Sequence, residues 1–168
     1  MNISLRAFST PDLPMLASWV ANGDLSQFMS RWAPHSSVDG RFNGELTRWW
    51  VIVADGRDAG CVWLERSGPD ETVADLGIFL AEAADRGHGI GRRALQLAQE
   101  AAAAPWHLQT VRLRVREANA RALACYHAAG FETINRGEKI VAGERIRILE
   151  MARHLNRQTK QCLPGDQR

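Results

Sequence analysis

Short runs of apolar, β-branched and aromatic residues recur along the chain, and turn-forming residues separate them. Seven such runs have the length and composition of β-strands. They cover residues 2–7, 48–54, 59–65, 72–80, 110–115, 131–140 and 145–151. Asp55–Asp58 and Ala142-Gly143 lie between consecutive runs, and each predicts a hairpin turn.

Four other segments place their apolar residues at helical spacing. The predicted helices cover residues 11–20, 24–32, 90–104 and 119–129. Thr10 followed by Pro11 favours the start of the first helix, with Thr10 as its N-cap. Pro105 ends the third helix and Gly130 closes the last one.

The resulting order is strand, helices, three strands, helix, strand, helix and two strands. This order predicts a mixed α/β fold with a largely antiparallel sheet of about seven strands, one parallel crossover and about four helices. A length of 168 residues suits a single domain. We expect the domain to span residues 1–151 and residues 152–168 to form a polar, flexible tail.

Composition narrows the class of protein further. Hydrophobic residues make up 45% of the chain, and the formal charge of +2 is too small to indicate a nucleic-acid partner. The three cysteines are far apart, which favours reduced thiols over a disulfide framework or a metal site. Neither a signal peptide nor a membrane-length apolar run is present. We therefore expect a cytoplasmic protein without a membrane partner, either a monomer or a homodimer.

The segment Arg86–Arg93 connects the predicted strand 72–80 to the long helix and reads Arg-Gly-His-Gly-Ile-Gly-Arg-Arg. Backbone N–H groups at a helix N-terminus lack carbonyl partners, and the helix dipole adds partial positive charge there. Glycines allow close approach of a ligand, and arginines flank them. The segment therefore predicts a phosphate or pyrophosphate site. Its candidate contacts are Arg86, Gly87, His88, Gly89, Ile90, Gly91, Arg92 and Arg93.

Three other interpretations of this loop were weighed. A P-loop is excluded because its lysine motif is absent. Residues 89–94 satisfy the dinucleotide pattern G-x-G-x-x-G/A, with Glu117 as a possible ribose ligand. The long connector Ala81–Asp85 and the antiparallel-looking strands before it argue against that fold. A structural turn without a ligand is the third alternative.

A second group of motif residues lies in the segment Asn119–Phe131. With the loop, it resembles the GNAT superfamily of N-acetyltransferases. The loop pattern of that family, Gln/Arg-x-x-Gly-x-Gly/Ala, is met by Arg86, Gly89 and Gly91. Its later pattern is met by Asn119, Ala122, Tyr126, Gly130 and Phe131. The resemblance covers about Ile3 to Met151, and residues 5–19 look like the branch of aminoglycoside, siderophore, ribosomal-protein and polyamine acetyltransferases.

The resemblance implies that acetyl-CoA is the co-substrate and that no metal takes part. The loop would hold its pyrophosphate. The preceding strand would splay from its parallel neighbour and offer the backbone of Leu76, Ile78 and Leu80 to the pantetheine arm. Asn119 would bind the pantetheine or cap its helix.

The resemblance also implies catalytic roles. Tyr126 would act as the general acid that protonates the leaving thiolate. Asp75 on the central strand is the tentative general base, and Glu82 just beyond the strand is the alternative. Transfer would be direct, with Cys125 as a buried thiol and not an acyl carrier.

The acceptor is predicted only by class. The connector Ala81–Asp85 lacks the proline of most relatives and is one residue longer than the usual spacing. Some aminoglycoside acetyltransferases share this length, which favours a small cationic amine of the aminoglycoside or polyamine type. The alternatives are the N-terminus of a protein such as a ribosomal protein, a sensor that binds acyl-CoA without turnover, and a dinucleotide-binding protein.

Overall fold

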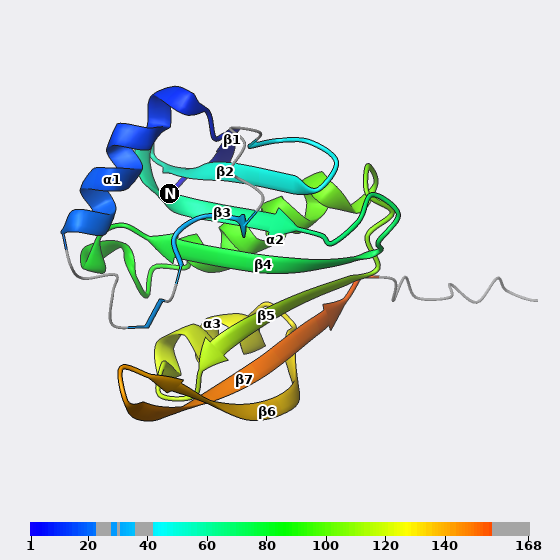
Figure 1. Ribbon diagram of the computed structural model, residues 1–168. Helices are drawn as coiled ribbons and strands as arrows, with labels where there is room; N and C mark the ends of the chain where they lie inside the picture. Colours follow the sequence, from blue (N-terminus) through cyan, green and yellow to red (C-terminus); the bar gives the residue numbers. More distant parts are fainter. Residues whose placement is uncertain (23–27, 30, 36–41, 156–168) are drawn as a thin grey trace, which may run out of the picture.

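Seven strands form a single sheet in the order β1-β2-β3-β4-β5-β7-β6 in the computed structural model (Figure 1). The structure describes residues 1–22, 28–29, 31–35 and 42–155. The strands are β1 (Ile3–Ala7), β2 (Thr47–Ala54), β3 (Arg57–Glu65), β4 (Val73–Leu80), β5 (Thr110–Arg116), β6 (Glu132–Val141) and β7 (Glu144–His154). Neighbouring strands run antiparallel except for β4 and β5, which are parallel. The predicted mixed sheet with one parallel crossover is confirmed.

Three α-helices occur among the described residues, where about four were predicted. They are α1 (Leu13–Ala21), α2 (Ile90–Ala103) and α3 (Ala120–Ala128). The helix predicted over residues 24–32 lies mostly outside the described residues, and its described positions 28–29 and 31–32 are not helical.

The first helix begins differently from the prediction. A 3₁₀ turn, Thr10–Asp12, precedes α1, and Ser9 occupies the N-cap position that was assigned to Thr10. The Asp12 carboxylate accepts hydrogen bonds from the Ser9 backbone N–H and hydroxyl, at 2.9 and 3.0 Å. Arg6 donates to the same carboxylate at 2.8 and 3.0 Å. Because Asp12 is held from two sides, the turn forms one residue earlier than Pro11 alone suggests.

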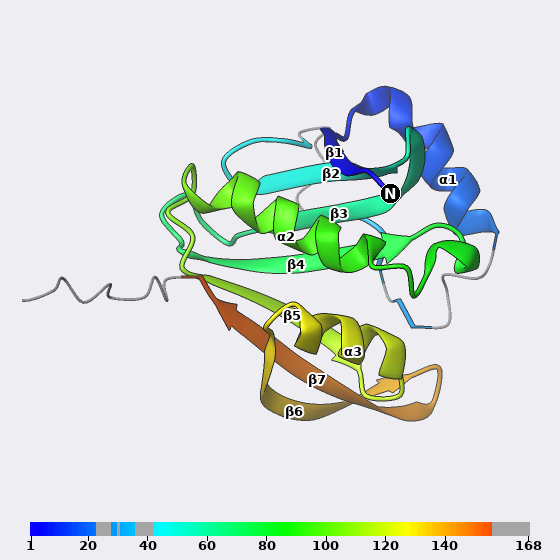
Figure 2. The same ribbon diagram turned by 180° about the vertical axis from the view of Figure 1, so that it is seen from behind.

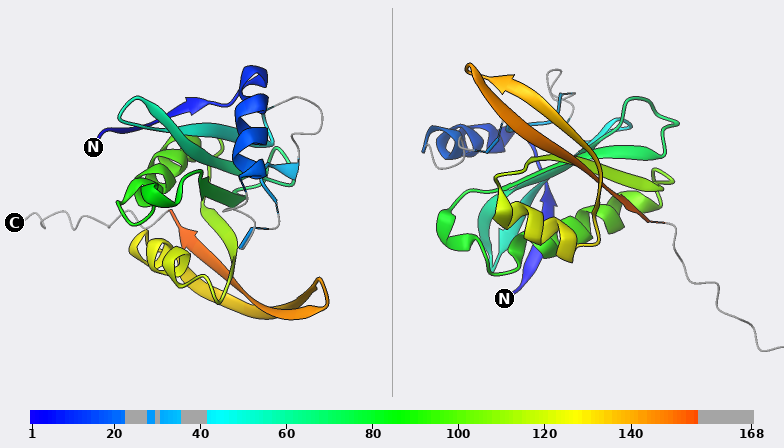
Figure 3. Two further views of the ribbon diagram at one scale, coloured as in Figure 1. Left: turned by 90° about the vertical axis from the view of Figure 1, so that its left-hand side faces the viewer. Right: turned by 90° about the horizontal axis from the view of Figure 1, so that it is seen from below.

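The two faces of the sheet bury separate apolar clusters. Helices α2 and α3 cover one face, and α1 covers the other (Figures 2 and 3). Under α2, the core includes Leu64, Leu76, Ala94, Leu95 and Val111. Under α1, it includes Phe8, Leu16, Trp49, Trp63 and Phe79. The alternation of β4 divides its residues between these cores, as expected for a strand buried on both faces.

Strand β7 continues into residues that were predicted to begin the tail. Ala152, Arg153 and His154 pair with Arg112, Val111 and Thr110 of β5. The backbone hydrogen bonds of the central sheet therefore extend the domain to at least His154. Residues 156–168 lie outside the described part of the chain.

The parallel pair β4–β5 is short. Pairing joins Val73 to Thr110, Ala74 to Val111 and Asp75 to Arg112, and then the strands diverge (Figure 1). β3 stays paired with β4 as far as Leu80, and β7 stays paired with β5 as far as Arg116. The divergence leaves one edge of β4 without a strand neighbour beyond Asp75. The predicted splay of the two strands is confirmed.

Gly77 lies beside this divergence, opposite Trp63 of β3. A Cβ at position 77 would stand 2.0 Å from Cζ2 of the Trp63 ring, which is only 1% exposed. The indole therefore crosses β4 at the one position where no side chain is present.

We predict that Gly77→Ala lowers the free energy of unfolding by about 1–3 kcal/mol, because the buried indole has to move. Chemical denaturation of both proteins measures the change. Gly44→Ala is the control, since a Cβ there meets nothing within 4 Å. Equal stability of the two variants would contradict the close packing of Trp63 on Gly77.

Candidate active site

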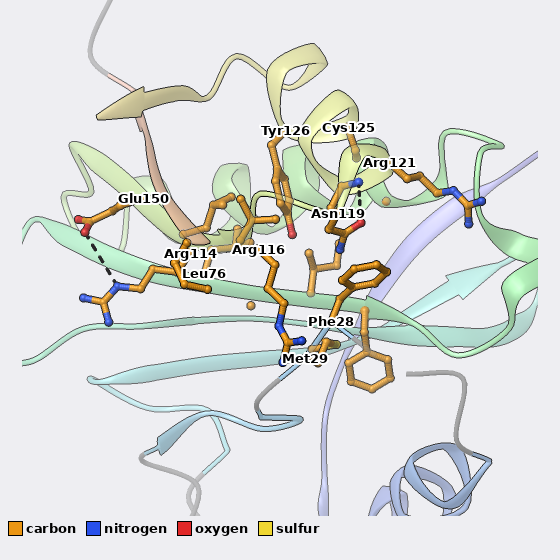
Figure 4. Close-up of a pocket in the computed structure, with 18 of the residues that line it drawn as sticks. Phe28, Met29, Leu76, Arg114, Arg116, Asn119, Arg121, Cys125, Tyr126 and Glu150 are labelled. Atoms are coloured by element: carbon orange, nitrogen blue, oxygen red, sulfur yellow. Dashed lines mark hydrogen bonds and ion pairs between the residues drawn. The ribbon is translucent and has the colours of Figure 1, made fainter. Parts of the chain in front are cut away.

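The gap between β4 and β5 opens into a groove of about 1770 Å³ (Figure 4). Its lining comes from β4, the loop before α2, β5, α3, the β6–β7 hairpin and the described residues between 28 and 35. The groove therefore collects side chains from segments that lie far apart in the sequence. Their meeting point is the place where strand pairing stops.

The glycine loop forms one end of the groove. Gly87 and Gly89 have positive φ angles of 84° and 83°, which side-chain-bearing residues rarely adopt. Gly89 is the N-cap of α2, and the first N–H groups of this helix have no helical acceptor. An anion at this position would meet these N–H groups and the helix dipole together.

Not every predicted loop residue reaches the groove. The lining residues from the loop are Arg86, Gly87, His88, Gly89, Gly91 and Arg92. The side chain of Ile90 is 2% exposed and belongs to the core under α2, so only its backbone is available to a ligand. Arg93 lines a smaller cavity between α2 and α3.

The unpaired edge of β4 forms the floor of the groove. Leu76 is buried, and Ile78 and Leu80 pack against the core under α2. All three also line the groove. Their side chains therefore serve the core, while the open strand edge leaves backbone groups available to an extended ligand.

Helix α3 supplies two of the predicted residues. Asn119 is the N-cap, and its side-chain oxygen accepts a 3.2 Å hydrogen bond from the Ala122 N–H. The half-buried ring of Tyr126 packs edge-on against Phe131, with centroids 6.1 Å apart. Figure 4 shows the Tyr126 side chain reaching from α3 toward the groove.

Burial raises the pKa of two side chains of α3, those of Tyr126 and Cys125. It raises the pKa of Tyr126 above its ordinary value near 10, so the hydroxyl stays protonated at neutral pH. It also raises the pKa of the Cys125 thiol. Since the thiolate is the nucleophilic form of cysteine, Cys125 is a poor candidate for an acyl carrier.

The two predicted bases lie in different places. Asp75 lines the groove, and both of its carboxylate oxygens accept hydrogen bonds from Arg112, at 3.0 and 3.2 Å. Glu82 is exposed and precedes the 3₁₀ turn Ala83–Asp85, away from the lining of the groove. The structure therefore brings Asp75 and Tyr126 to one groove, and leaves Glu82 outside it.

The groove contains charged residues that the sequence did not single out. The carboxylate of Glu65 is buried, pairs with Arg31 and accepts a 2.7 Å hydrogen bond from the His35 N–H. Glu150 lies 3.9 Å from Arg114 (Figure 4). Glu65 ends an otherwise apolar strand, which is a weak sequence signal for a special role. Glu150 gives no such signal, because its position depends on how β7 pairs with β5.

One side of the groove is built on the face that α1 covers. Phe28, Met29 and Arg31 line it there, together with Trp63. The Arg31 guanidinium lies over the Trp63 ring, 5.6 Å from its centroid. This side is therefore aromatic and charged, whereas the side next to α3 is mainly apolar.

Among the described residues, no group of three or more His, Cys, Asp or Glu side chains could hold a metal ion. Within the same part of the chain, no helix combines the length and the apolarity that crossing a bilayer requires.

A groove between splayed parallel strands, with a glycine loop at a helix N-terminus, is the arrangement that the resemblance to acetyltransferases predicted. The sequence profile of the acetyltransferase (GNAT) domain matches residues 2–132. The chain therefore belongs to the GNAT acetyltransferase family, and it is an acyltransferase of the N-acetyltransferase class. No curated protein sequence matches the chain.

Several solved structures share the fold. Aminoglycoside acetyltransferase AAC(6′)-Ib in complex with coenzyme A and kanamycin is 19% identical, with a TM-score of 0.69 over 92% of this chain and 95% of that one. Spermidine N-acetyltransferase from Vibrio cholerae, in complex with CoA and spermine, is 17% identical, with a TM-score of 0.76 over 90% and 95%. A GNAT-family acetyltransferase from Streptococcus pneumoniae is 18% identical, with a TM-score of 0.74 over 91% and 99%.

The dinucleotide-binding alternative does not agree with the observed sheet. That fold needs a mostly parallel sheet, whereas β4 and β5 are the one parallel pair among the described strands. The pattern at residues 89–94 instead belongs to the acetyltransferase loop.

We predict that Asn119→Ala lowers the free energy of unfolding by about 1 kcal/mol, because the Ala122 N–H loses its acceptor. Asn119→Asp is the matched control and is expected to retain the cap. Denaturant titration of the three proteins provides the measurement. A fully stable alanine variant would show that the cap contributes nothing to α3.

Proposed function

We propose that this protein transfers the acetyl group of acetyl-CoA directly to a primary amine. The observation that carries the proposal is the open edge of β4, which lies in one groove with the glycine loop and Tyr126. Structural neighbours solved with bound CoA support this choice of donor.

The donor is proposed to lie along the floor of the groove. Its pyrophosphate would accept hydrogen bonds from the N–H groups around Gly89 and Gly91, with Arg86 and Arg92 nearby. The pantetheine arm would run beside the edge of β4 from Leu80 toward Leu76 and bond to its backbone, as an added strand does. The thioester would then lie close to Tyr126.

The proposed reaction involves the amine as nucleophile and Tyr126 as general acid. The neutral amine attacks the thioester carbonyl and forms the new C–N bond. The C–S bond then breaks, and the Tyr126 hydroxyl gives its proton to the leaving thiolate. The attacking nitrogen loses a proton as the amide forms, and this proton restores the neutral tyrosine through water. The apolar surroundings that raise the pKa of Tyr126 keep the hydroxyl proton available at all pH values at which the amine can react.

The amine must first lose its own proton. At pH 7 an amine with a pKa near 10 is neutral in about one molecule in a thousand, a handicap of roughly 4 kcal/mol. Asp75 is the proposed acceptor of this proton through a water molecule, since it is the predicted base that lines the groove. Because Arg112 occupies both carboxylate oxygens, the water has to bond to the remaining lone pairs of Asp75.

For the acceptor we propose a small cationic amine of the aminoglycoside or polyamine type. Neighbours in complex with kanamycin and with spermine support this class. One observation favours the alternative, a protein N-terminus. Among the described residues, each carboxylate that lines the groove lies within 4.0 Å of an arginine, in the pairs Glu65–Arg31, Asp75–Arg112, Glu150–Arg114 and Glu138–Arg145. The groove therefore contains little uncompensated negative charge that could attract a polycation. The N-terminus of a peptide depends less on such negative charge.

Release of free CoA from acetyl-CoA, measured with kanamycin, spermidine and short peptides as acceptors, tests the proposal. In this assay we predict that Tyr126→Phe lowers kcat by about 10- to 100-fold and leaves KM for acetyl-CoA nearly unchanged, because only the general acid is lost. Binding of acetyl-CoA without release in the presence of any amine would instead indicate a sensor.

The pH dependence tests whether the pKa of Tyr126 is raised. For the unmodified protein, kcat/KM is expected to rise from pH 7 to 9.5 as the amine deprotonates, without a descending limb, because the raised pKa keeps Tyr126 protonated. The phenylalanine variant should follow the same rise at a lower level. A decline below pH 9.5 in the unmodified protein that the phenylalanine variant lacks would show that the pKa of Tyr126 is not raised.

We predict that Gly89→Val abolishes binding of acetyl-CoA in isothermal titration calorimetry. A β-branched residue at a φ of 83° is strained by about 1–3 kcal/mol, and its side chain would crowd the loop N–H groups. Gly56→Val is the control, because Gly56 has a similar φ of 80° in the β2–β3 turn, away from the groove. Unchanged affinity in the Gly89 variant would exclude the loop as the pyrophosphate site.

A further inference from the structure

Strand β6 is an open edge of the sheet. It pairs with β7 on one side, and no described strand lies on the other (Figures 1 and 2). Eight of its ten residues are exposed. Two of them, Ile134 and Ile140, are large hydrophobic residues with exposures of 54% and 64%. An exposed edge strand with isoleucines is a template for pairing with another strand.

The hairpin turn decides which backbone groups of β6 point outward. Val141 and Glu144 close the two-residue turn Ala142-Gly143, whose φ angles are both positive, at 50° and 82°. In such a turn the closing residues exchange hydrogen bonds, and hydrogen-bonded pairs then alternate along the hairpin. Lys139 and Gly137 therefore bond to β7. The N–H and C=O groups of Arg136, Glu138 and Ile140 point outward and are free to pair.

We propose that β6 pairs in antiparallel orientation with β6 of a second copy of this chain, with the two-fold axis at Gly137. In this register Arg136 lies opposite Glu138 of the partner, and the symmetry produces this pair twice. Opposite charges on directly facing residues are favourable in an antiparallel strand pair. Ile134 lies at the register shift between Thr133 and Asn135, outside the regular part of this edge.

Neighbouring registers are unfavourable. A two-fold axis at Arg136 or at Glu138 places two like charges directly opposite each other, which is destabilising. At Gly137 the axis meets no side chain, and a Cβ there would find nothing within 4 Å. Since the backbone groups of Gly137 bond to β7, its pair with the partner's Gly137 is of the close, non-hydrogen-bonded type.

The charges on this face extend across the proposed interface. Within one chain, Arg136 pairs with Glu117 at 3.2 Å and Glu138 pairs with Arg145 at 3.3 Å. The dimer joins these pairs into the alternating series Glu117, Arg136, the partner's Glu138 and the partner's Arg145. A network of this kind is more favourable than isolated surface pairs.

The dimer also affects the groove. The β6 residues that line it are Asn135, Gly137, Glu138, Lys139 and Val141. In the proposed register the partner's Lys139 lies opposite Asn135, so each subunit adds a cation at the rim of the other's groove. The proposal does not depend on the reaction assigned to the groove, because the strand edge and its register are independent of the donor.

Cross-linking at the two-fold axis tests the register. We expect Gly137→Cys, in a Cys125→Ser, Cys162→Ser background, to form a covalent dimer with oxidised glutathione, because Cα atoms of a close antiparallel pair lie within disulfide range. Lys139→Cys in the same background is the control. Its partner is displaced by four strand positions, about 13 Å, and should not cross-link.

Sedimentation velocity over a range of concentrations tests the dimer itself. A strand pair of this length buries less than the roughly 1,200 Å² of a standard interface, so we expect a concentration-dependent dimer. Arg136→Glu and Glu138→Arg should each weaken it about tenfold or more, and the double exchange should restore it. A chain that stays monomeric at several hundred micromolar would overturn the proposal. Equal cross-linking of the two cysteine variants, or a double exchange as weak as either single one, would overturn the register.

Discussion

The loss of pairing between β4 and β5 after three residues is the constraint on which the rest of this structure depends. Parallel strands gain hydrogen bonds with every added pair, and an unpaired edge exposes backbone groups that need other partners. Here the last paired residues, Asp75 and Arg112, are also joined by two side-chain hydrogen bonds. This ion pair marks the vertex of the gap.

Two parts of the fold meet at this vertex. One consists of β1–β4 with α1 and α2, and the other of β5–β7 with α3. They approach each other again where the first turn of α2 meets α3, since a Cβ at Gly91 would lie 3.6 Å from the Cys125 sulfur. The glycine loop and Tyr126 belong to different parts, so their relative position is set by the angle of the gap. The smaller part is held together by Phe131 in its core and by Glu117, which bonds to Arg136 and Arg147 of the hairpin.

Much of this arrangement could be predicted from the sequence, because its signals are local. Alternation and turn residues predicted the seven strands, and glycine spacing predicted a loop whose Gly87 and Gly89 have positive φ angles. Asn119 was predicted to cap its helix or to bind the pantetheine, and it is the N-cap of α3. The resemblance to acetyltransferases implied a tyrosine near the thioester, and Tyr126 lines the groove. The pairs Glu65–Arg31 and Glu150–Arg114 could not be predicted, because they depend on strand register and on contacts between distant segments. The start of α1 was missed for the same reason, since Arg6 from β1 helps to fix Asp12.

The proposed transfer to an amine makes opposite demands on two protons, and the two faces of the sheet offer different surroundings for them. The general acid must keep its proton, which requires apolar surroundings, whereas the amine must lose its proton, which requires charged groups and water. Tyr126 packs against the core under α2, while Asp75 and Glu65 project from the opposite face of the sheet. A fully paired sheet would separate these environments by a continuous backbone layer. Because β4 and β5 diverge, the groove connects the two faces of the sheet. An extended ligand that pairs with the edge of β4 would have its reactive end within reach of groups from both faces.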